Sequence, residues 1–356
     1  MTNARAARMK YSPGRLGYDE MTRVGIAVRR ERAARGWAVG LLAGFGPLAC
    51  APGPDADAGR LVVFNAGSLA APFRDLLREF TRLHPEYETI QESAGSLETA
   101  RKLTELGRIP DVVGVADYGV IPALLVPRFA GWYVGFARNA MVLAYTDRSI
   151  AAAEIDSTNW WRILLRPDVR VARADPSLDP NGYRSLMVYQ LAERHYREPG
   201  LAAHLLAASP RRFVRAKEAD LVALLQAGEV DYAWSYRSMA LTLGFRHLSL
   251  PASIDLSDPD LADRYREAAV RVPGATHDAD SVEFHGEPIV YGLTIPRGAA
   301  HQDAAHRFVR FVLSGAGRAI LDRHGFTLLA RPGIGGPEAP PADIFPDSLP
   351  DPSPQR

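Results

Sequence analysis

The sequence predicts an α/β fold, because apolar segments of strand length alternate with longer segments of helical periodicity along residues 60–330. Residues 61–64 read as a buried strand, and Leu69, Phe73, Leu76 and Leu77 then recur at helical spacing. Such alternation is typical of mostly parallel sheets flanked by helices. Ligands of open α/β sheets bind at the carboxyl ends of strands, so we expect the functional site there.

Two Gly-Ser pairs occupy that position. Gly67 and Ser68 follow the first apolar run. Gly95 and Ser96 follow a second, shorter extended stretch whose last apolar residue is Ile90. Each pair precedes a helical pattern, and a helix start carries unpaired N–H groups and a partial positive charge. Two such starts facing each other predict a site for a small anion. The alternative is that both serines are ordinary N-caps.

The remaining elements continue the alternation. Further strands are expected at 111–116, 141–145, 169–172, 232–234 and 288–295, and further helices at 183–196, at 221–225 before Gly228, and from Gln302 onward. The folded body is therefore expected to span about 60–330.

Charge and motifs exclude several function classes. The chain of 356 residues has a formal net charge of +1, and nine basic and three acidic residues within 1–50 leave a mildly acidic body. An acidic body argues against nucleic acid as a partner. The sequence has no phosphate-binding GxxxxGK[ST] loop and no GxSxG or SxxK motif, so we expect neither an ATPase nor a serine hydrolase.

The first 50 residues resemble a bacterial lipoprotein signal. Arginines precede an apolar stretch at 37–49 that is too short to span a bilayer comfortably, and Cys50, the sole cysteine, ends it. We expect export, with Cys50 carrying lipid and 51–59 forming a tether; the alternative is a simple cleaved signal with an incidental cysteine. Residues 331–356 are rich in proline and glycine and predict an irregular tail.

The body resembles the substrate-binding proteins of ABC transporters for tungstate and molybdate, in their archaeal-type branch. The matching segments are FNAGSL at 64–69, SAGS at 93–96, DVVGVADY at 111–118, DPSLDPNGYRSLM at 175–187, YRS at 236–238 and PIVYG at 288–292. The resemblance implies a two-lobed periplasmic-binding-protein-like fold of type II. Lobe 1 is then expected at 60–140 and 290–330, and lobe 2 at 141–289.

The resemblance also implies the function and the partners. We expect a receptor that captures a tungstate or molybdate oxyanion between its lobes and delivers it to an ABC permease with its ATPase. It implies a monomer that faces the periplasm or the outside of the cell, without enzymatic activity and without a cofactor. The alternatives are a receptor for another tetrahedral oxyanion, sulfate or phosphate, and, less favoured, an enzyme on the same fold.

Six residues are the expected oxyanion-binding site by position in the matched motifs. They are Ser68, Ser96, Asp179, Gly182, Tyr183 and Ser235. The family uses an aspartate and a glutamate to contact the metal centre; Asp179 matches the aspartate, with Asp175 as fallback, and an ordinary Asx turn is the alternative. Ser235 stands where the glutamate is expected, so the sequence predicts one carboxylate and a site built mainly from hydrogen bonds.

Overall fold

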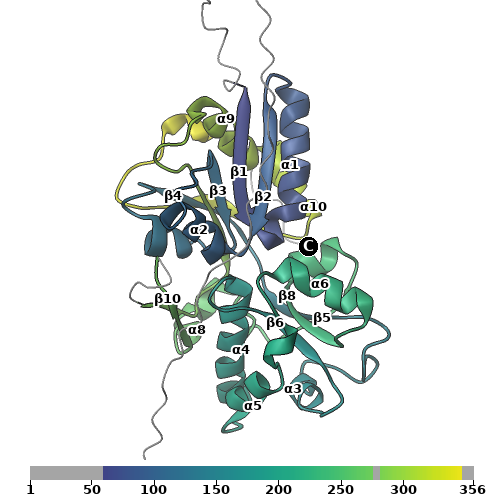
Figure 1. Ribbon diagram of the computed structural model, residues 1–356. Helices are drawn as coiled ribbons and strands as arrows, with labels where there is room; N and C mark the ends of the chain where they lie inside the picture. The colour runs from purple at the N-terminus through teal and green to yellow at the C-terminus, as the bar shows by residue number, and fades with distance from the viewer. Residues whose placement is uncertain (1–58, 276–280, 347–356) are drawn as a thin grey trace, which may run out of the picture. The chain divides into compact units, whose positions relative to one another are not determined.

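The computed structural model describes residues 59–275 and 281–346, which belong to one compact unit within Pro52–Arg356. The predicted signal at 1–50, Cys50, and the tether apart from Gly59 lie outside the described residues. The described chain is α/β, with helices packed beside two main sheets (Figure 1). Within these residues, no helix combines the length and the apolar character needed to cross a bilayer.

The first sheet has six strands in the order β13-β4-β12-β3-β1-β2. Its strands are β1 (Arg60–Ala66), β2 (Glu88–Ala94), β3 (Val112–Val115), β4 (Tyr133–Arg138), β12 (Val290–Thr294) and β13 (Thr327–Gly335). β1 pairs in parallel with β2 and β3, whereas β12 pairs antiparallel with β3 and β4, and β13 pairs antiparallel with β4.

The second sheet has five strands in the order β7-β6-β8-β5-β9. Its strands are β5 (Met141–Tyr145), β6 (Val171–Ala174), β7 (Val214–Arg215), β8 (Tyr232–Tyr236) and β9 (Arg246–Ser249). β6 is parallel to β7 and β8, and β5 is antiparallel to β8 and β9. The α/β prediction is confirmed, but both sheets are mixed rather than mostly parallel, because strands next to the crossings between the sheets run against their neighbours.

We call the first sheet with its helices lobe 1 and the second sheet with its helices lobe 2. The chain crosses between them at Asn139 and Ala140, which join β4 to β5, and returns between β9 and β12. The return segment includes a two-stranded antiparallel ribbon of β10 (Ala269–Pro273) and β11 (Ser281–His285).

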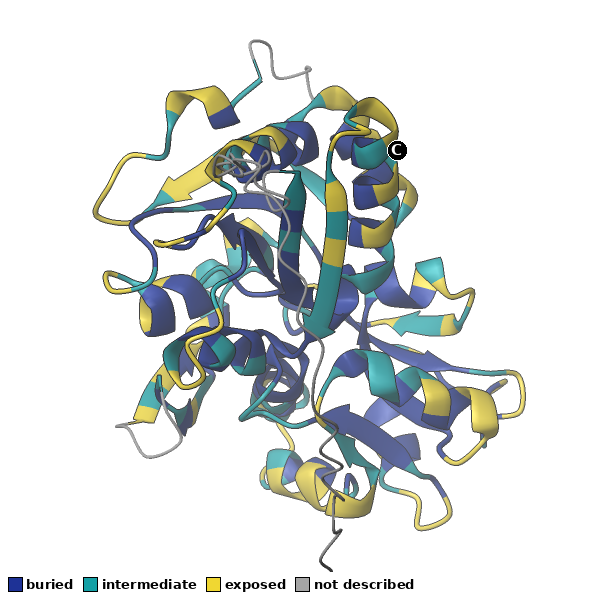
Figure 2. Ribbon diagram, turned by 45° about the horizontal axis from the view of Figure 1, so that its top comes forward, coloured by how far each residue is buried: buried dark blue, intermediate teal, exposed yellow. Residues whose placement is uncertain are grey.

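Amphipathic helices cover both sheets (Figure 2). The helices of lobe 1 are α1 (Ala70–Leu83), α2 (Ser96–Thr104), α9 (Gln302–Leu313) and α10 (Gly315–Arg323). Those from β5 to β12 are α3 (Trp160–Leu164), α4 (Pro180–Tyr196), α5 (Leu201–Ala207), α6 (Glu218–Ala227), α7 (Arg237–Thr242) and α8 (Ala262–Tyr265). Short helical turns are η1 (Gly67–Leu69), η2 (Ile121–Leu125), η3 (Arg211–Phe213), η4 (Pro259–Leu261) and η5 (Ala342–Ile344).

The helical spacing in α1 places its large apolar side chains on one face. Phe73, Leu76 and Phe80 are fully buried, and the Phe73 and Phe80 rings meet the Phe308 ring of α9 edge-on at centroid distances of 6.0 and 5.4 Å. Burying these side chains stabilises lobe 1, since each large apolar side chain removed from water contributes about 1.5–3 kcal/mol. The start of α1 is thereby held rigidly next to the end of β1.

The prediction of an irregular tail at 331–356 is wrong for residues 331–335. Residues 331–335 continue β13, where Ile334 pairs with Val134 of β4, and Ile344 further on is fully buried. A Cβ on Gly335 would lie 2.2 Å from the Tyr133 ring, so glycine permits this close pairing. The glycines that suggested irregular structure therefore serve a strand.

Candidate functional site

The starts of four helical segments, two from each lobe, meet at the interface between the lobes. A Cβ on Gly95, before α2, would lie 2.2 Å from the Leu178 carbonyl oxygen and 3.1 Å from Cβ of Asp179, the N-cap of α4. A Cβ on Gly67, in η1, would lie 3.6 Å from Cβ of Lys217, which precedes α6. Each helix start contributes positive potential from its backbone dipoles, so this interface suits an anion.

Ser68 and Ser96 are both buried at this interface, on the lobe 1 side. Neither serine is an N-cap, because Ala66 and Gly95 hold those positions. No side chain caps either helix start by a hydrogen bond. The Ser68 hydroxyl accepts a hydrogen bond from the Tyr291 hydroxyl at 2.9 Å, and the Ser96 hydroxyl accepts from the Ala116 amide at 3.0 Å. The N-cap interpretation is therefore wrong, and each hydroxyl keeps its own proton for another acceptor.

Asp179 is buried on the lobe 2 side as the N-cap of α4. Its Oδ1 accepts from the Asn181 amide at 2.8 Å, which is the local turn that the sequence left as an alternative. Its Oδ2 accepts from the Glu218 amide at 3.1 Å. Asp179 therefore ties the start of α4 to the start of α6, while each oxygen retains a lone pair.

Gly182 and Tyr183 follow in the first turn of α4. A Cβ on Gly182 would lie 2.5 Å from the carbonyl carbon of Asp175, so glycine allows α4 to pack against the preceding loop. The Tyr183 hydroxyl donates to Oδ2 of Asp117 in lobe 1. Tyr183 thus contacts the opposite lobe.

A second buried carboxyl group, which the sequence analysis did not anticipate, lies beside Ser235. Ser235 lies in β8, and its hydroxyl donates at 2.7 Å to Oε1 of Glu218, the first residue of α6. Oε1 also accepts from the Tyr236 amide at 2.6 Å, while Oε2 is buried with no hydrogen-bond partner. A carboxyl group therefore lies beside Ser235 of β8, but it belongs to α6.

Glu218 could have been noticed in the sequence. It precedes the leucines of the predicted helix at 221–225, and an acidic residue at a helix start is ordinary, because it complements the helix dipole. It follows the short strand β7 of the lobe 2 sheet, as the Gly-Ser pairs follow strands of the lobe 1 sheet, and this position was the available signal.

Burial shifts the pKa of both carboxyl groups. Burial raises the pKa of Asp179 to about 6, although hydrogen bonds from the Asn181 and Glu218 amides oppose the shift. Burial raises the pKa of Glu218 to about 8, against the hydrogen bonds from Ser235 and Tyr236. Glu218 is therefore mostly protonated at neutral pH in the ligand-free protein, which limits repulsion between the two carboxyl groups.

Two polar atoms in this cluster are buried and have no hydrogen-bond partner. They are Oε2 of Glu218 and Oδ1 of Asn181, whose Nδ2 donates to the Trp234 carbonyl at 3.2 Å. Buried polar atoms without partners are uncommon and call for an explanation such as a missing ligand. In the part of the chain that is described, no group of three or more His, Cys, Asp or Glu side chains could hold a metal ion.

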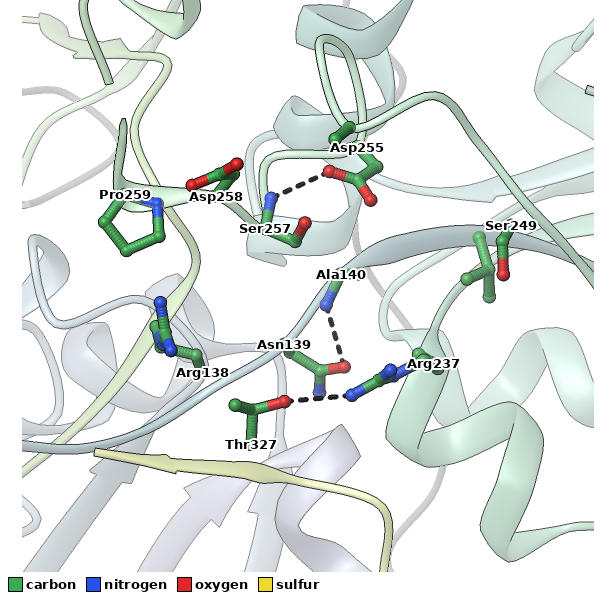
Figure 3. Close-up of a pocket in the computed structure, with 12 residues that line it drawn as sticks. Arg138, Asn139, Ala140, Arg237, Ser249, Asp255, Ser257, Asp258, Pro259 and Thr327 are labelled. Atoms are coloured by element: carbon green, nitrogen blue, oxygen red, sulfur yellow. Dashed lines mark hydrogen bonds between the residues drawn. The ribbon is translucent and has the colours of Figure 1, made fainter. Parts of the chain in front are cut away.

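A separate pocket of about 370 Å³ lies beside the crossing at Asn139 (Figure 3). It contains none of the six predicted residues. Its lining mixes positive charge from Arg138 and Arg237 with negative charge from Asp255 and Asp258. A mixed lining gives no clear preference for an anion, so we place the candidate site at the helix starts.

Comparison with known proteins shows the family of this chain. A family model described as bacterial extracellular solute-binding protein matches residues 61–327. The chain belongs to this family.

Two curated relatives are similar over most of their length. An uncharacterized solute-binding protein of Petrotoga mobilis is 43% identical over 82% of this chain and 89% of the relative. The molybdate/tungstate-binding protein WtpA of Pyrococcus abyssi is 35% identical over 80% of this chain and 90% of the relative.

Two solved structures share the fold. The periplasmic molybdate-binding protein of Azotobacter vinelandii superposes with a TM-score of 0.55 at 16% identity, covering 76% of this chain and 99% of that one. The sulfate-binding protein SubI of Mycobacterium tuberculosis gives 0.53 at 13% identity, covering 75% and 86%. The predicted periplasmic-binding-protein-like fold of type II is confirmed.

Proposed function

We propose that this solute-binding protein captures tungstate or molybdate between its lobes. The observation that carries the proposal is the buried, unpartnered Oε2 of Glu218 next to Asp179, in a cluster that also holds Ser68 and Ser96. The name of the Pyrococcus abyssi relative points to the same ligands.

Two kinds of group serve two parts of such a ligand. Hydroxyl and helix-start N–H groups donate to the oxygens of the oxyanion and replace its hydration. Asp179 and Glu218 are negative when ionised and repel those oxygens, but each can bind the central metal, which is a hard, high-valent acceptor of oxygen ligands. We infer that both carboxylates contact the metal, in place of the single contact expected from the sequence.

Sulfate and phosphate fit this arrangement less well. A site with one carboxylate would leave sulfate and phosphate as alternatives, but Glu218 adds a second carboxyl group beside Ser235. Sulfur and phosphorus in these anions do not accept further oxygen ligands, so two carboxyl groups near them only add repulsion unless both are protonated. We therefore expect discrimination by metal coordination as well as by size.

The remaining parts of the function are proposals as well. The protein is exported, held at the membrane by lipid on Cys50, works as a monomer without catalytic turnover, and passes its ligand to an ABC permease and its ATPase. Mass spectrometry of the protein from a membrane fraction tests the anchor: a lipid adduct on Cys50 supports it, and an unmodified mature chain refutes it.

Calorimetric titration of the purified protein tests the ligand. Tungstate and molybdate should bind at least 100-fold more tightly than sulfate and phosphate, a gap of about 2.8 kcal/mol. Glu218→Gln should narrow this gap, whereas Glu229→Gln, which changes a glutamate beyond the other end of α6, should not. Equal affinity for all four anions, or no binding of either metal oxyanion, would reject the proposal.

A further inference from the structure

A buried ion pair joins the two lobes beside the candidate site. Nη2 of Arg184, in α4 of lobe 2, lies 3.0 Å from Oδ2 of Asp117, which follows β3 of lobe 1. The side chains are 2% and 4% exposed. A buried charge without its partner is costly, so this pair favours the conformation in which the lobes touch.

Other hydrogen bonds fix the pair in place. Nη1 of Arg184 donates to the Ala116 carbonyl at 2.8 Å, again across the lobe interface, and to the Tyr236 hydroxyl at 2.9 Å. Oδ1 of Asp117 accepts from the Gly119 amide at 2.9 Å, and its Oδ2 also accepts from the Tyr183 hydroxyl. Asp117 thus accepts hydrogen bonds from both lobes, and the positive charge that neutralises it comes from Arg184 of lobe 2.

The same arginine faces the carboxyl groups of the site. Its positive charge lowers the pKa of both Asp179 and Glu218, although burial outweighs that effect for each group. In lobe 2 alone, Arg184 has these two carboxyl groups as neighbours. When the lobes meet, it gains Asp117 as well, so the carboxylate of lobe 1 and the guanidinium of lobe 2 neutralise each other in the buried interface.

We propose that Asp117 and Arg184, with the Tyr183 hydroxyl, form a latch that holds the closed conformation and slows ligand release. Asp117 is a positioning residue, because its carboxylate accepts hydrogen bonds from Gly119 and Tyr183, forms an ion pair with Arg184, and acts on the ligand through the lobe interface. The inference rests on the proposed function for its ligand, but the contact itself is a property of the two lobes.

Stopped-flow measurements of tungstate binding test the latch in the full chain. We expect Asp117→Asn to raise Kd about 100-fold, mostly through a faster dissociation rate, since losing one partner of a buried charge pair acts mainly on dissociation. The double variant Asp117→Asn with Arg184→Gln should lose less than the product of the two single losses, because no buried charge is left unpaired. Arg170→Gln is the control, since its ion pair with Asp231 at 3.0 Å lies within lobe 2.

Hydrogen exchange of the ligand-free protein separates the latch from the ligand assignment. Asp117→Asn should lower the protection of the first turn of α4 and of residues 116–119, whereas Arg170→Gln should leave both unchanged. Strictly multiplicative single losses, or unchanged protection in Asp117→Asn, would overturn the latch. If the wild-type protein binds neither metal oxyanion, the proposed ligand is wrong, and the exchange result alone decides the latch.

Discussion

The contact between Gly95 and the Leu178 carbonyl makes lobe closure sensitive to one methyl group. Gly95 has φ −64° and ψ 149°, which any residue adopts, so Gly95→Ala introduces no backbone strain of its own. Its Cβ, however, would lie 2.2 Å from the Leu178 oxygen, where ordinary contact begins at 3.4 Å. The lobes must therefore move apart locally by about 1.2 Å.

That displacement breaks two hydrogen bonds between the lobes. The Leu97 and Glu98 amides donate to the Leu178 carbonyl at 3.1 and 3.2 Å. At about 1 kcal/mol for each bond, the closed conformation loses about 2 kcal/mol, and tungstate affinity should fall roughly 30-fold. The free energy of unfolding should fall by no more than about 2 kcal/mol, because each lobe keeps its own sheet and helices.

Gly67→Ala is the matched control, since it changes the other glycine that precedes a site serine. Its Cβ would lie 3.6 Å from its nearest neighbours, Ala219 and Lys217, which is ordinary contact. Calorimetric titration should show a large loss for Gly95→Ala and a loss below about 3-fold for Gly67→Ala. Equal effects of the two substitutions, or wild-type affinity in Gly95→Ala, would refute the reasoning from closure.

Three further predictions follow from burial and pairing. Because burial raises the pKa of Glu218 to about 8 in the fold from 4.5 in the unfolded chain, this residue alone should remove about 3 kcal/mol of stability between pH 5 and pH 8, and the free energy of urea unfolding of Glu218→Gln should fall by about that much less over the same range. Binding of tungstate at pH 7 should release about one proton, because Glu218 ionises when it contacts the metal, and tungstate affinity should therefore fall as the pH is lowered below 8. Calorimetric titration in buffers of different ionisation enthalpy measures this release. If no proton is released, Glu218 does not contact the metal. Gly335→Ala should lower the melting temperature by several degrees, because its Cβ meets the Tyr133 ring at 2.2 Å, whereas Gly333→Ala, with open space around it, should not.

The sequence was informative where local pattern and position determine structure. Periodicity located the first strand and α1, and the Gly-Ser pairs marked two helix starts that do meet the opposite lobe. Asp179 was recognisable because it lies within one continuous matched segment, residues 175–187, and its turn to Asn181 is local as well. These features depend on residues close together in the chain.

Glu218 was missed because its role depends on residues that are distant in the chain. It lies 39 residues after Asp179 and 17 before Ser235, and only the arrangement of β7, β8 and α6 brings the three together. The direction of strands beside the crossings and the extension of β13 also depend on pairing between distant segments. Spacing along one sequence contains no direct record of such pairings.

The order of strands in lobe 1 has a consequence for how the chain folds as it is synthesised. All strands of lobe 2 lie within 141–249, so its sheet is complete once that stretch has emerged from the ribosome. In lobe 1, β4 lies between β12 and β13, which follow it by more than 150 residues. β4 consequently has neither of its neighbours until late in synthesis, and the second lobe in sequence is the first that can complete its sheet.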